Sequence, residues 1–450
     1  MLSSLNSKVR EVRRRPVVAG RLLAGFAVWS AQTVALAASG PMGVADLTQA
    51  TLGHHPAMRG ATAKTEAAQL SVDAAKWQFW PTPSIGFERL QSGSEQGAQG
   101  DKTIGVFRLQ QPLWTGGRLT SGLQKAESSA LEAEAEAQEV KQTLSTRVIT
   151  SWSEAVVAMR KLEAQRQSLE RHERLLQMVE RRLAEGASAQ SDAALARSRI
   201  ELLQAEVQLL QAQRDSALDR LKLLTGRPLS ANDLALAHEA QPVVRLTLAD
   251  LVDRAKALSP QLQKTLQATE VARADVGLAK ASLMPEVALR YEHQSGNFSV
   301  ANAANTNRVF VTLNSALGAG LSSLSGVNAA VAQLTVAQEQ IAEQEQAIAE
   351  QVQLDFTLVQ AAQARIRGLA SAAKASADVL DSYERQFLAG RKQWLDLMNA
   401  AREQAQTESQ LADALGALEL SSLRLVLLTA GVDALLQVKA LPNGRTGGVQ

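Results

Sequence analysis

The side chains best suited to acid–base or metal chemistry in this sequence are five scattered histidines. They are His54, His55, His172, His238 and His293. Their spacing matches no metal-ligand motif, and none is placed to activate a serine or aspartate as part of a triad. Cysteine is absent, which excludes disulfides and thiol chemistry. The sequence therefore indicates no catalytic site, no metal and no cofactor, and we expect a protein that is not an enzyme.

The sequence does repeat itself, at a constant offset of 204 residues. Pairs that keep this offset are Pro56/Pro260, Pro81/Pro285, Glu88/Glu292, Trp152/Phe356, Gly186/Gly390 and Asp192/Asp396. Each copy has the pattern of a helical segment, two short strands and two very long helices. Such a unit cannot bury its own apolar surface, so it must pack against further copies.

Glycine and proline breaks, together with changes of apolar period, divide the chain into five parts. We expect a signal peptide at 1–37, a first repeat at 38–226, a linker at 227–247, a second repeat at 248–433 and a tail at 434–450. In the first repeat a helix over 46–79 precedes strands at 84–90 and 103–110 and long helices at 118–184 and 191–224. In the second, a helix over 248–283 precedes strands at 286–293 and 308–315 and long helices at 322–388 and 393–429.

The N-terminal segment has the organisation of a cleaved secretory signal. Six basic residues precede an apolar run over 22–37, which ends in an Ala-x-Ala site at 35–37. An anchor helix is the alternative, but the run falls short of the ~20 residues that a membrane span needs. Without this segment the net charge is about −3, so nothing favours nucleic acid as a partner.

The long helices predict rods rather than globular domains. The segment 118–184 would be ~100 Å long, and its apolar residues follow a heptad that is interrupted by a four-residue step at Val148 and Trp152. Aromatic residues make up only 4% of the chain, as in coiled coils. Each of these helical segments carries charge or glutamine, so we expect none of them to cross a membrane.

The short strands alternate apolar and polar residues. Their apolar positions are Ile85, Phe87, Phe107, Leu109, Val287, Leu289, Tyr291, Val309, Val311 and Leu313. A soluble sheet over a core would show this pattern, and so would a transmembrane barrel with lipid outside and water inside. The secretory signal favours the barrel. Four strands cannot close one, and an open edge in lipid is prohibitively costly, so the chain must oligomerise.

One segment is specific enough to indicate a family. Residues 111–118 read QPLWTGGR, which is similar to the strand-to-helix turn of the TolC family of bacterial outer-membrane export ducts. Pro81 and the segment 223–226 (LLTG) also match. The resemblance covers about residues 46–433. It implies a mainly α fold with a small β part, in which a homotrimer shares one β-barrel in outer-membrane lipid and one long coiled-coil α-barrel in the periplasm. It also implies a periplasmic adaptor (membrane fusion) protein and an inner-membrane ABC or proton-driven transporter as partners.

The resemblance implies roles for three groups of residues. Asp396 matches an acidic ring at the periplasmic gate, to which Asn399 and Asp192 are the related positions. Candidate adaptor contacts at the hairpin tips are Leu183, Gly186, Phe387, Gly390, Arg391 and Trp394. The strand–helix turns contain Gly116, Gly117, Gly318 and Gly320. The alternatives are that the aspartates only favour the helix dipole and that the aromatic residues pack within the ring.

Residues 386–399 (QFLAGRKQWLDLMN) resemble ducts of type I protein secretion more than drug-efflux ducts. The favoured interpretation is a passive duct of a tripartite export system, and the outer-membrane component of a multidrug efflux pump is the alternative. A structural periplasmic or surface coiled-coil protein would explain the heptads, but not the two alternating hairpins.

Overall fold

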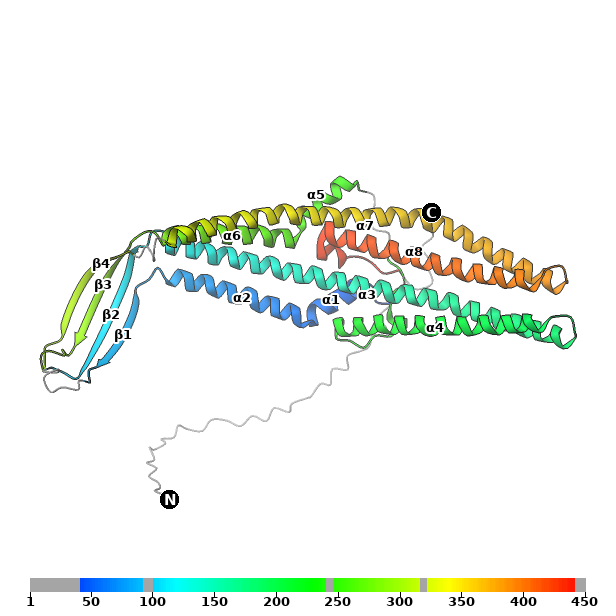
Figure 1. Ribbon diagram of the computed structural model, residues 1–450, viewed down its shortest axis with the longest axis horizontal. Coiled ribbons are helices and arrows are strands. Elements are labelled where there is room, and N and C mark those ends of the chain that lie inside the picture. Colours follow the sequence, from blue (N-terminus) through cyan, green and yellow to red (C-terminus); the bar gives the residue numbers. More distant parts are fainter. Residues whose placement is uncertain (1–40, 92–99, 240–245, 316–321, 442–450) are drawn as a thin grey trace, which may run out of the picture. The chain divides into compact units, whose positions relative to one another are not determined.

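The computed structural model describes residues 41–91, 100–239, 246–315 and 322–441, and Gly40–Gln450 form one compact unit. The expected signal peptide at 1–37 lies outside the described residues. The elements are α1 (Val44–His54), α2 (Pro56–Trp77), β1 (Thr82–Arg89), β2 (Thr103–Trp114), α3 (Arg118–Ala184), α4 (Gln190–Thr225), the 3-10 helix η1 (Ala231–Asp233), α5 (Leu248–Leu258), α6 (Pro260–Ala281), β3 (Glu286–Ser295), β4 (Thr306–Asn314), α7 (Ser322–Leu388) and α8 (Trp394–Leu435). Within this unit the strands lie at one end of the helices, and the α3–α4 and α7–α8 turns lie at the other (Figure 1).

The first helix of each repeat is two helices, so the single helices expected over 46–79 and 248–283 were wrong. Pro56 and Pro260 each occupy the first turn of the second helix, where a missing N–H costs nothing. The residue before a proline is pushed to extended backbone. His55 and Ser259 accordingly have ψ of 132° and 114°, and their side chains cap α2 and α6.

The two longest helices have the bounds that the sequence predicts, 118–184 and 322–388. They differ in their surroundings. Helix α3 contacts α1, α2, α4, α6 and α8, whereas α7 contacts α5, α6 and α8. Helix α3 therefore lies between other helices inside the helical layer, whereas α7 lies at an edge of that layer.

The strands form one antiparallel sheet in the order β1-β2-β3-β4. Ile85 pairs with Phe107, and Leu109 pairs with Tyr291, so the apolar positions expected from alternation do share one face. The opposite face carries an ion pair between Arg108 and Glu292, 3.0 Å apart.

All four strands extend beyond their expected ranges, and β1 does so by beginning at Thr82, two residues before position 84. Strand β2 runs four residues past position 110, because a register shift between Pro112 and Trp114 accommodates the proline. Strand β3 continues two residues past 293, and β4 begins two residues before 308.

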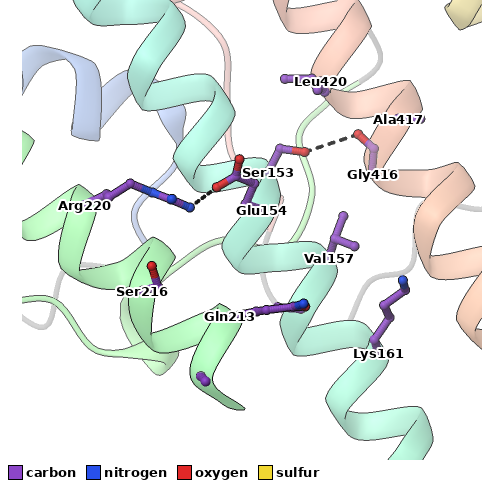
Figure 2. A pocket seen from close by; sticks show the side chains of 12 residues that line it. Ser153, Glu154, Val157, Lys161, Gln213, Ser216, Arg220, Gly416, Ala417 and Leu420 are labelled. Atoms are coloured by element: carbon purple, nitrogen blue, oxygen red, sulfur yellow. Dashed lines mark hydrogen bonds and ion pairs between the residues drawn. The ribbon is translucent and has the colours of Figure 1, made fainter. Parts of the chain in front are cut away.

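The two repeats are joined by close packing of α3 on α8. A Cβ at Gly416 would lie 2.0 Å from Val157, so only glycine permits this approach. Ser153 donates a hydrogen bond to the Gly416 carbonyl at 3.4 Å (Figure 2). Next to this contact, a groove of about 610 Å³ lies over α3, and α4 and α8 form its two walls.

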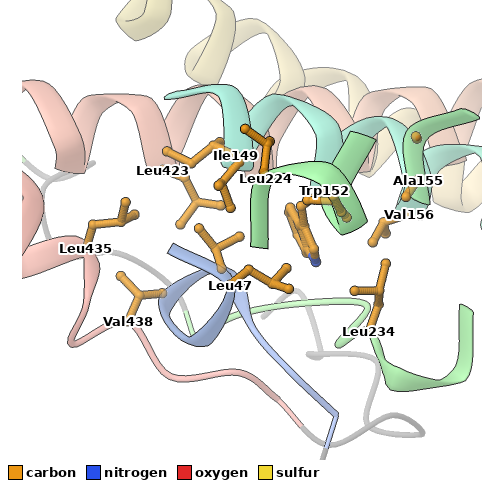
Figure 3. Packing of buried hydrophobic residues seen from close by; sticks show 14 of the residues in the cluster. Leu47, Ile149, Trp152, Ala155, Val156, Leu224, Leu234, Leu423, Leu435 and Val438 are labelled. Carbon is orange, nitrogen blue, oxygen red and sulfur yellow. The ribbon is translucent and has the colours of Figure 1, made fainter. Parts of the chain in front are cut away.

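The largest apolar cluster surrounds Trp152 (Figure 3). Its indole Nε1 donates to the Ala235 carbonyl at 3.0 Å, and its ring meets His238 edge-on at 4.5 Å. Leu229 and Leu234 thus belong to the core, although the sequence predicted only a linker there. His238 also pairs with Ala440, so the described part of the expected tail is anchored beside the linker.

Helix α8 extends to Leu435, beyond the expected position 429, and is kinked at Gly431, where φ is 82°. It is long and apolar enough to pass for a membrane span on length and composition. However, Leu423, Leu425 and Leu427 are buried against the other helices. Its apolar character is therefore explained by its place in the core.

Candidate functional site

The two helical turns at the tip end have the same backbone geometry. Gly186 and Gly390 have φ of 74° and 72°. Each glycine N–H bonds the carbonyl three residues earlier, at 3.0 Å, and the following N–H bonds the carbonyl five residues earlier. This is a Schellman arrangement, which ends a helix with a residue in the left-handed conformation. Both turns therefore require glycine, because it adopts the left-handed backbone conformation without strain.

The side chains of the two turns differ. Phe387 and Trp394 flank the second turn and are buried, with ring centroids 5.4 Å apart. They belong to an apolar cluster that includes Val179 from α3 and Ala193 from α4. The packing alternative thus describes these two aromatic residues better than the adaptor contact that was expected of them.

Arg182, which the sequence analysis missed, connects the two turns. Its guanidinium donates to the Phe387 carbonyl at 2.9 Å and lies 4.7 Å from the centre of the Phe387 ring. The signal in the sequence was weak, because many arginines occur on α3 and only tertiary contact distinguishes this one.

The acidic candidates have different partners. Asp396 is half-buried and pairs with Lys392 at 3.3 Å, and Lys392 also lies 4.3 Å from the centre of the Tyr383 ring. Hydrogen bonding to Asp396 raises the pKa of Lys392. Asp192 instead accepts from the Ala189 N–H at 3.3 Å and so caps α4. The Asp192 contact supports the helix-dipole alternative for that residue.

Four other tip candidates remain at least partly accessible. Gly186, Gly390 and Arg391 are exposed and Leu183 is half-buried. Asn399, the weaker gate candidate, is exposed as well. Two exposed leucines, Leu388 and Leu395, also flank the second turn and were not singled out from the sequence.

The strand–helix turn of the first repeat is a backbone device. Gly116 and Gly117 have φ of 61° and 96°, which side chains disfavour. A Cβ on Gly116 would also lie 2.3 Å from the Cβ of Met284. The expected counterparts, Gly318 and Gly320, lie outside the described residues.

The groove in Figure 2 holds no unpaired charge suited to catalysis. Glu154 is ion-paired with Arg220, and Lys161 with Asp413 at 2.7 Å. Among the residues that the structure describes, no group of three metal-ligating side chains gathers anywhere. The surfaces that the chain leaves open are therefore its candidate functional sites.

The helical layer has two apolar edges. One is formed by α7, whose exposed large apolar residues are Leu324, Val331, Val336, Leu354, Leu358, Val379 and Leu388. The other is formed by α2 and α4, with Leu70, Trp77, Leu202, Leu209 and Leu223. Helix α3 is as long as α7, yet within its described residues it exposes one such side chain, Leu131.

The sheet has two open edges as well. Within the described chain, β1 pairs only with β2, and β4 pairs only with β3. Apolar side chains on these outer strands are largely exposed, including Ile85 and Phe87 on β1 and Val309, Val311 and Leu313 on β4. The sheet thus ends in unpaired outer strands, and the helical layer ends in exposed apolar edges.

Comparisons with known proteins agree with this architecture. The sequence model of the family described as "Outer membrane efflux protein" matches residues 47–227 and 251–431, two segments with the 204-residue offset of the repeat. A comparison with curated protein sequences found no match.

Solved structures resemble the chain over most of its length. The outer-membrane channel OprN is 20% identical with a TM-score of 0.75, covering 87% of this chain and 90% of its own. The outer membrane protein VceC from Vibrio cholerae is 18% identical with a TM-score of 0.73, covering 86% and 96%. The CmeC outer membrane channel of Campylobacter jejuni is 13% identical with a TM-score of 0.73, covering 86% and 85%. At these identities the likeness establishes the fold.

Proposed function

Because the chain belongs to the outer membrane efflux protein family and is an outer-membrane efflux channel, we propose that three copies close its open edges into one passive duct. The observation that carries the proposal is the coincidence of open edges in two layers. An outer strand and an apolar helical edge occur on each side of the chain. The number three comes from the family resemblance.

The sheet requires closure if its apolar face is to lie in lipid. Unpaired N–H and C=O groups cost several kcal/mol each in a hydrocarbon layer, so spanning sheets have no free edge. Strands β1 and β4 each present such a row. Pairing β4 of one copy with β1 of the next satisfies both rows with one repeated interface, which closes into a ring.

The same interface covers the apolar edges of the helices. Helix α7 of one copy would pack against α2 and α4 of the next, burying the exposed residues named above. Burial of apolar surface stabilises a contact by about 25 cal/mol per Å². The contact between α7 of one copy and α2 and α4 of the next would therefore be favourable, because both surfaces are apolar. The polar strand face, with Arg108 and Glu292, would line the water-filled interior.

Asp396 is our candidate for the narrow periplasmic entrance. In a trimer it would recur three times, and a ring of carboxylates attracts cations. We expect Asp396→Asn to reduce cation selectivity in planar bilayers. Asp192→Asn is the matched control, because Asp192 caps α4 and should leave selectivity unchanged. Unaltered selectivity in Asp396→Asn would remove this residue from the gate.

The exposed tip residues suit an adaptor. Arg391 is exposed directly after the second turn, between the exposed Leu388 and Leu395. A partner helical hairpin could pack there as knobs into holes. Arg391→Glu should reduce export while leaving trimer assembly intact. Normal export by this variant would contradict the assignment.

For the cargo we favour protein over drugs, on the resemblance of residues 386–399 to type I secretion ducts. Part of this segment forms the core of the tip, since Phe387 and Trp394 are buried. A deletion strain distinguishes the two branches. Loss of a secreted protein with unchanged drug sensitivity supports protein secretion, and drug hypersensitivity with a normal secreted fraction supports efflux.

The experiment that tests the duct itself uses purified full-length protein. We expect it to resist carbonate extraction from membranes, to migrate as a trimer in detergent and to give discrete conductance steps in a bilayer. A monomer that leaves the membrane with carbonate would contradict the proposal.

A further inference from the structure

A second groove continues the groove of Figure 2 toward the helical tip. It has a volume of about 300 Å³, and α3 forms its floor between α4 and α8. The two grooves share one face of α3, because Lys161 of the first and Ser168 of the second are about two helical turns apart. The polar lining of the second groove includes Gln165, Ser168 and His172 from α3, Arg199 from α4, and Arg402 and Gln410 from α8.

The charged side chains of the two grooves differ in their partners. In the first groove, the acidic and the basic side chains are ion-paired, as described above. In the second, Arg199 and Arg402 have no ion-pair or hydrogen-bond partner among the residues that the structure describes. Glu206 also lines this groove but pairs with neither arginine. The second groove therefore has an excess of positive charge that the chain itself does not neutralise.

The floor of the second groove consists of buried polar side chains. Ser168 is 6% and His172 is 3% exposed. The Nδ1 of His172 lies 2.8 Å from the Ser168 carbonyl, so in the neutral ring it is Nδ1 that carries the hydrogen. Burial lowers the pKa of His172, the hydrogen bond to Ser168 opposes this effect, and the charge of Arg199 adds to it. The neutral form of the histidine is thus favoured in the groove.

Gln165 provides a second sign that the groove has an occupant. Its Oε1 atom is buried and has no hydrogen-bond partner in the described chain. Buried polar groups are normally hydrogen-bonded, so an occupant of the groove must supply this partner. The amide can offer that occupant either its oxygen or its NH₂ group, since a half-turn of the side-chain end exchanges the two.

The walls of the groove are held in place without a ligand. Arg171 on α3 donates to the buried Gln404 on α8 at 2.7 Å, and Gln404 donates to Glu408 at 2.8 Å. These bonds fix α8 beside α3 at the level of the groove. A preformed groove lowers the cost of ordering side chains when a ligand binds.

We propose that Arg199 and Arg402 bind carboxylate groups of an anionic ligand inside the duct. The planar guanidinium donates two parallel hydrogen bonds to a carboxylate, which makes arginine the side chain best matched to this group. Two arginines in one groove favour a ligand that carries at least two carboxylates. Gln165 supplies a further hydrogen bond from the floor.

This inference rests on the proposed function for the place of the site in the duct. Ser168 and His172 follow Trp152 by about four and a half and five and a half helical turns, so they lie on the opposite face of α3. The Trp152 face is covered by α1 and by Leu234 of the linker. A closed ring accommodates such an additional layer on its outer side, where the circumference is larger. The groove therefore opens toward the water-filled interior, where it meets whatever the duct conducts.

The site belongs to one repeat only. At the 204-residue offset its key side chains are replaced, in the pairs Gln165/Leu369, His172/Ser376, Arg199/Glu403 and Ser198/Arg402. The equivalent groove, between α7 and α8 of one copy and α4 of the next, would have a glutamate and a serine in place of the two arginines. A trimer would thus have three such sites rather than six.

Isothermal titration calorimetry of the full-length trimer in detergent tests the site, with citrate as the probe. We expect three citrates to bind per trimer. Arg199→Gln and Arg402→Gln should each weaken binding roughly tenfold, because each removes charge-assisted hydrogen bonds. Arg197→Gln is the matched control, since Arg197 also lies on α4 but is paired with Glu180 at 2.6 Å and does not line the groove. Failure of the wild type to bind citrate, or wild-type affinity in both groove variants, would overturn the site.

A second ligand distinguishes two sources of the carboxylates. A hexaglutamate peptide with blocked termini should displace citrate if the site contacts an acidic segment of a polypeptide cargo. Citrate binding that the peptide does not displace would assign the site to small polycarboxylates.

Single-channel recording separates the site from the duct. A trimer that conducts ions but binds no citrate would overturn the site alone. Citrate binding by a chain that forms no conducting trimer would contradict the duct and leave the carboxylate site in place, because the groove lies within one chain.

Discussion

The two repeats share a backbone but differ in the aromatic residues at the strand–helix junction and at the helical tip. The first repeat carries Trp77, Trp80 and Trp114 where strands meet helices, all exposed, whereas the second carries Phe387 and Trp394 at the helical tip, both buried. The glycine turns are superimposable in their hydrogen bonds. Duplication therefore preserved the features that shape the chain, and divergence changed what each end offers to its surroundings. The second repeat thus contributes a buried aromatic pair to the core of the tip.

The largest expected effect distinguishes the two tips. Trp394→Ala removes a buried indole from the tip cluster and should cost about 3–5 kcal/mol. Gln190→Ala changes the corresponding, exposed position of the first tip and should lie within about 0.5 kcal/mol of wild type. Thermal unfolding in detergent measures both variants. Equal effects would show that the tips are not packed differently.

Arg182 tests whether the first tip holds the second. Arg182→Ala removes a hydrogen bond and a cation–π contact to Phe387, so a loss of about 1–2 kcal/mol is expected. Hydrogen exchange should accelerate at the amides around Gly390. The control is Gln386→Ala at the equivalent position of α7, whose amide bonds Ser382 on its own helix. If both variants exchange at the wild-type rate, the cross-tip contact does not matter.

The two glycine turns should respond alike to substitution, because their backbone geometry is the same. Gly186→Ala and Gly390→Ala each force a side chain into the left-handed conformation, at a cost of about 1 kcal/mol. A Cβ at either site meets no atom within 4 Å, so the cost is confined to the backbone. Unequal shifts in unfolding temperature would contradict a shared turn.

The smallest expected effect concerns Asp355 on α7, whose counterpart on α3 is Ser151. Asp355 is fully buried, Gln351 donates to it at 2.9 Å, and Arg424 lies 3.7 Å away. Burial raises the pKa of Asp355 above 3.8. A raised folded-state pKa means that the native protein binds this proton more tightly than the unfolded chain does.

The carboxyl therefore contributes stability below pH 3.8, and this contribution is lost as pH rises through the raised pKa. Asp355→Asn should flatten that part of the pH–stability profile and raise stability at neutral pH by less than about 1 kcal/mol. A variant that is less stable than wild type at neutral pH would indicate that the ion pair with Arg424 outweighs desolvation.

Local patterns predicted the long elements well. The bounds of α3 and α7 followed from heptad spacing between glycine breaks, and the shared apolar face followed from period-two alternation. The split at Pro56 was missed because periodicity continues across a proline that begins a new helix. The burial of Phe387 and Trp394 was anticipated only as the alternative to adaptor contact, because a helical pattern does not say which neighbour covers a given face. The packing of the linker was not predicted, because its few apolar residues become part of the core only by packing around Trp152.

The most direct test of the account asks whether the two outer strands meet in neighbouring copies. The chain has no cysteine, so Ser84→Cys on β1 and Thr312→Cys on β4, combined in one chain and joined by a short bifunctional crosslinker, report only on engineered positions. Within one copy these strands are separated by β2 and β3. We predict that crosslinking in native outer membranes gives dimers and trimers and stops there. Monomers alone, or a ladder continuing past the trimer, would contradict a closed ring of three.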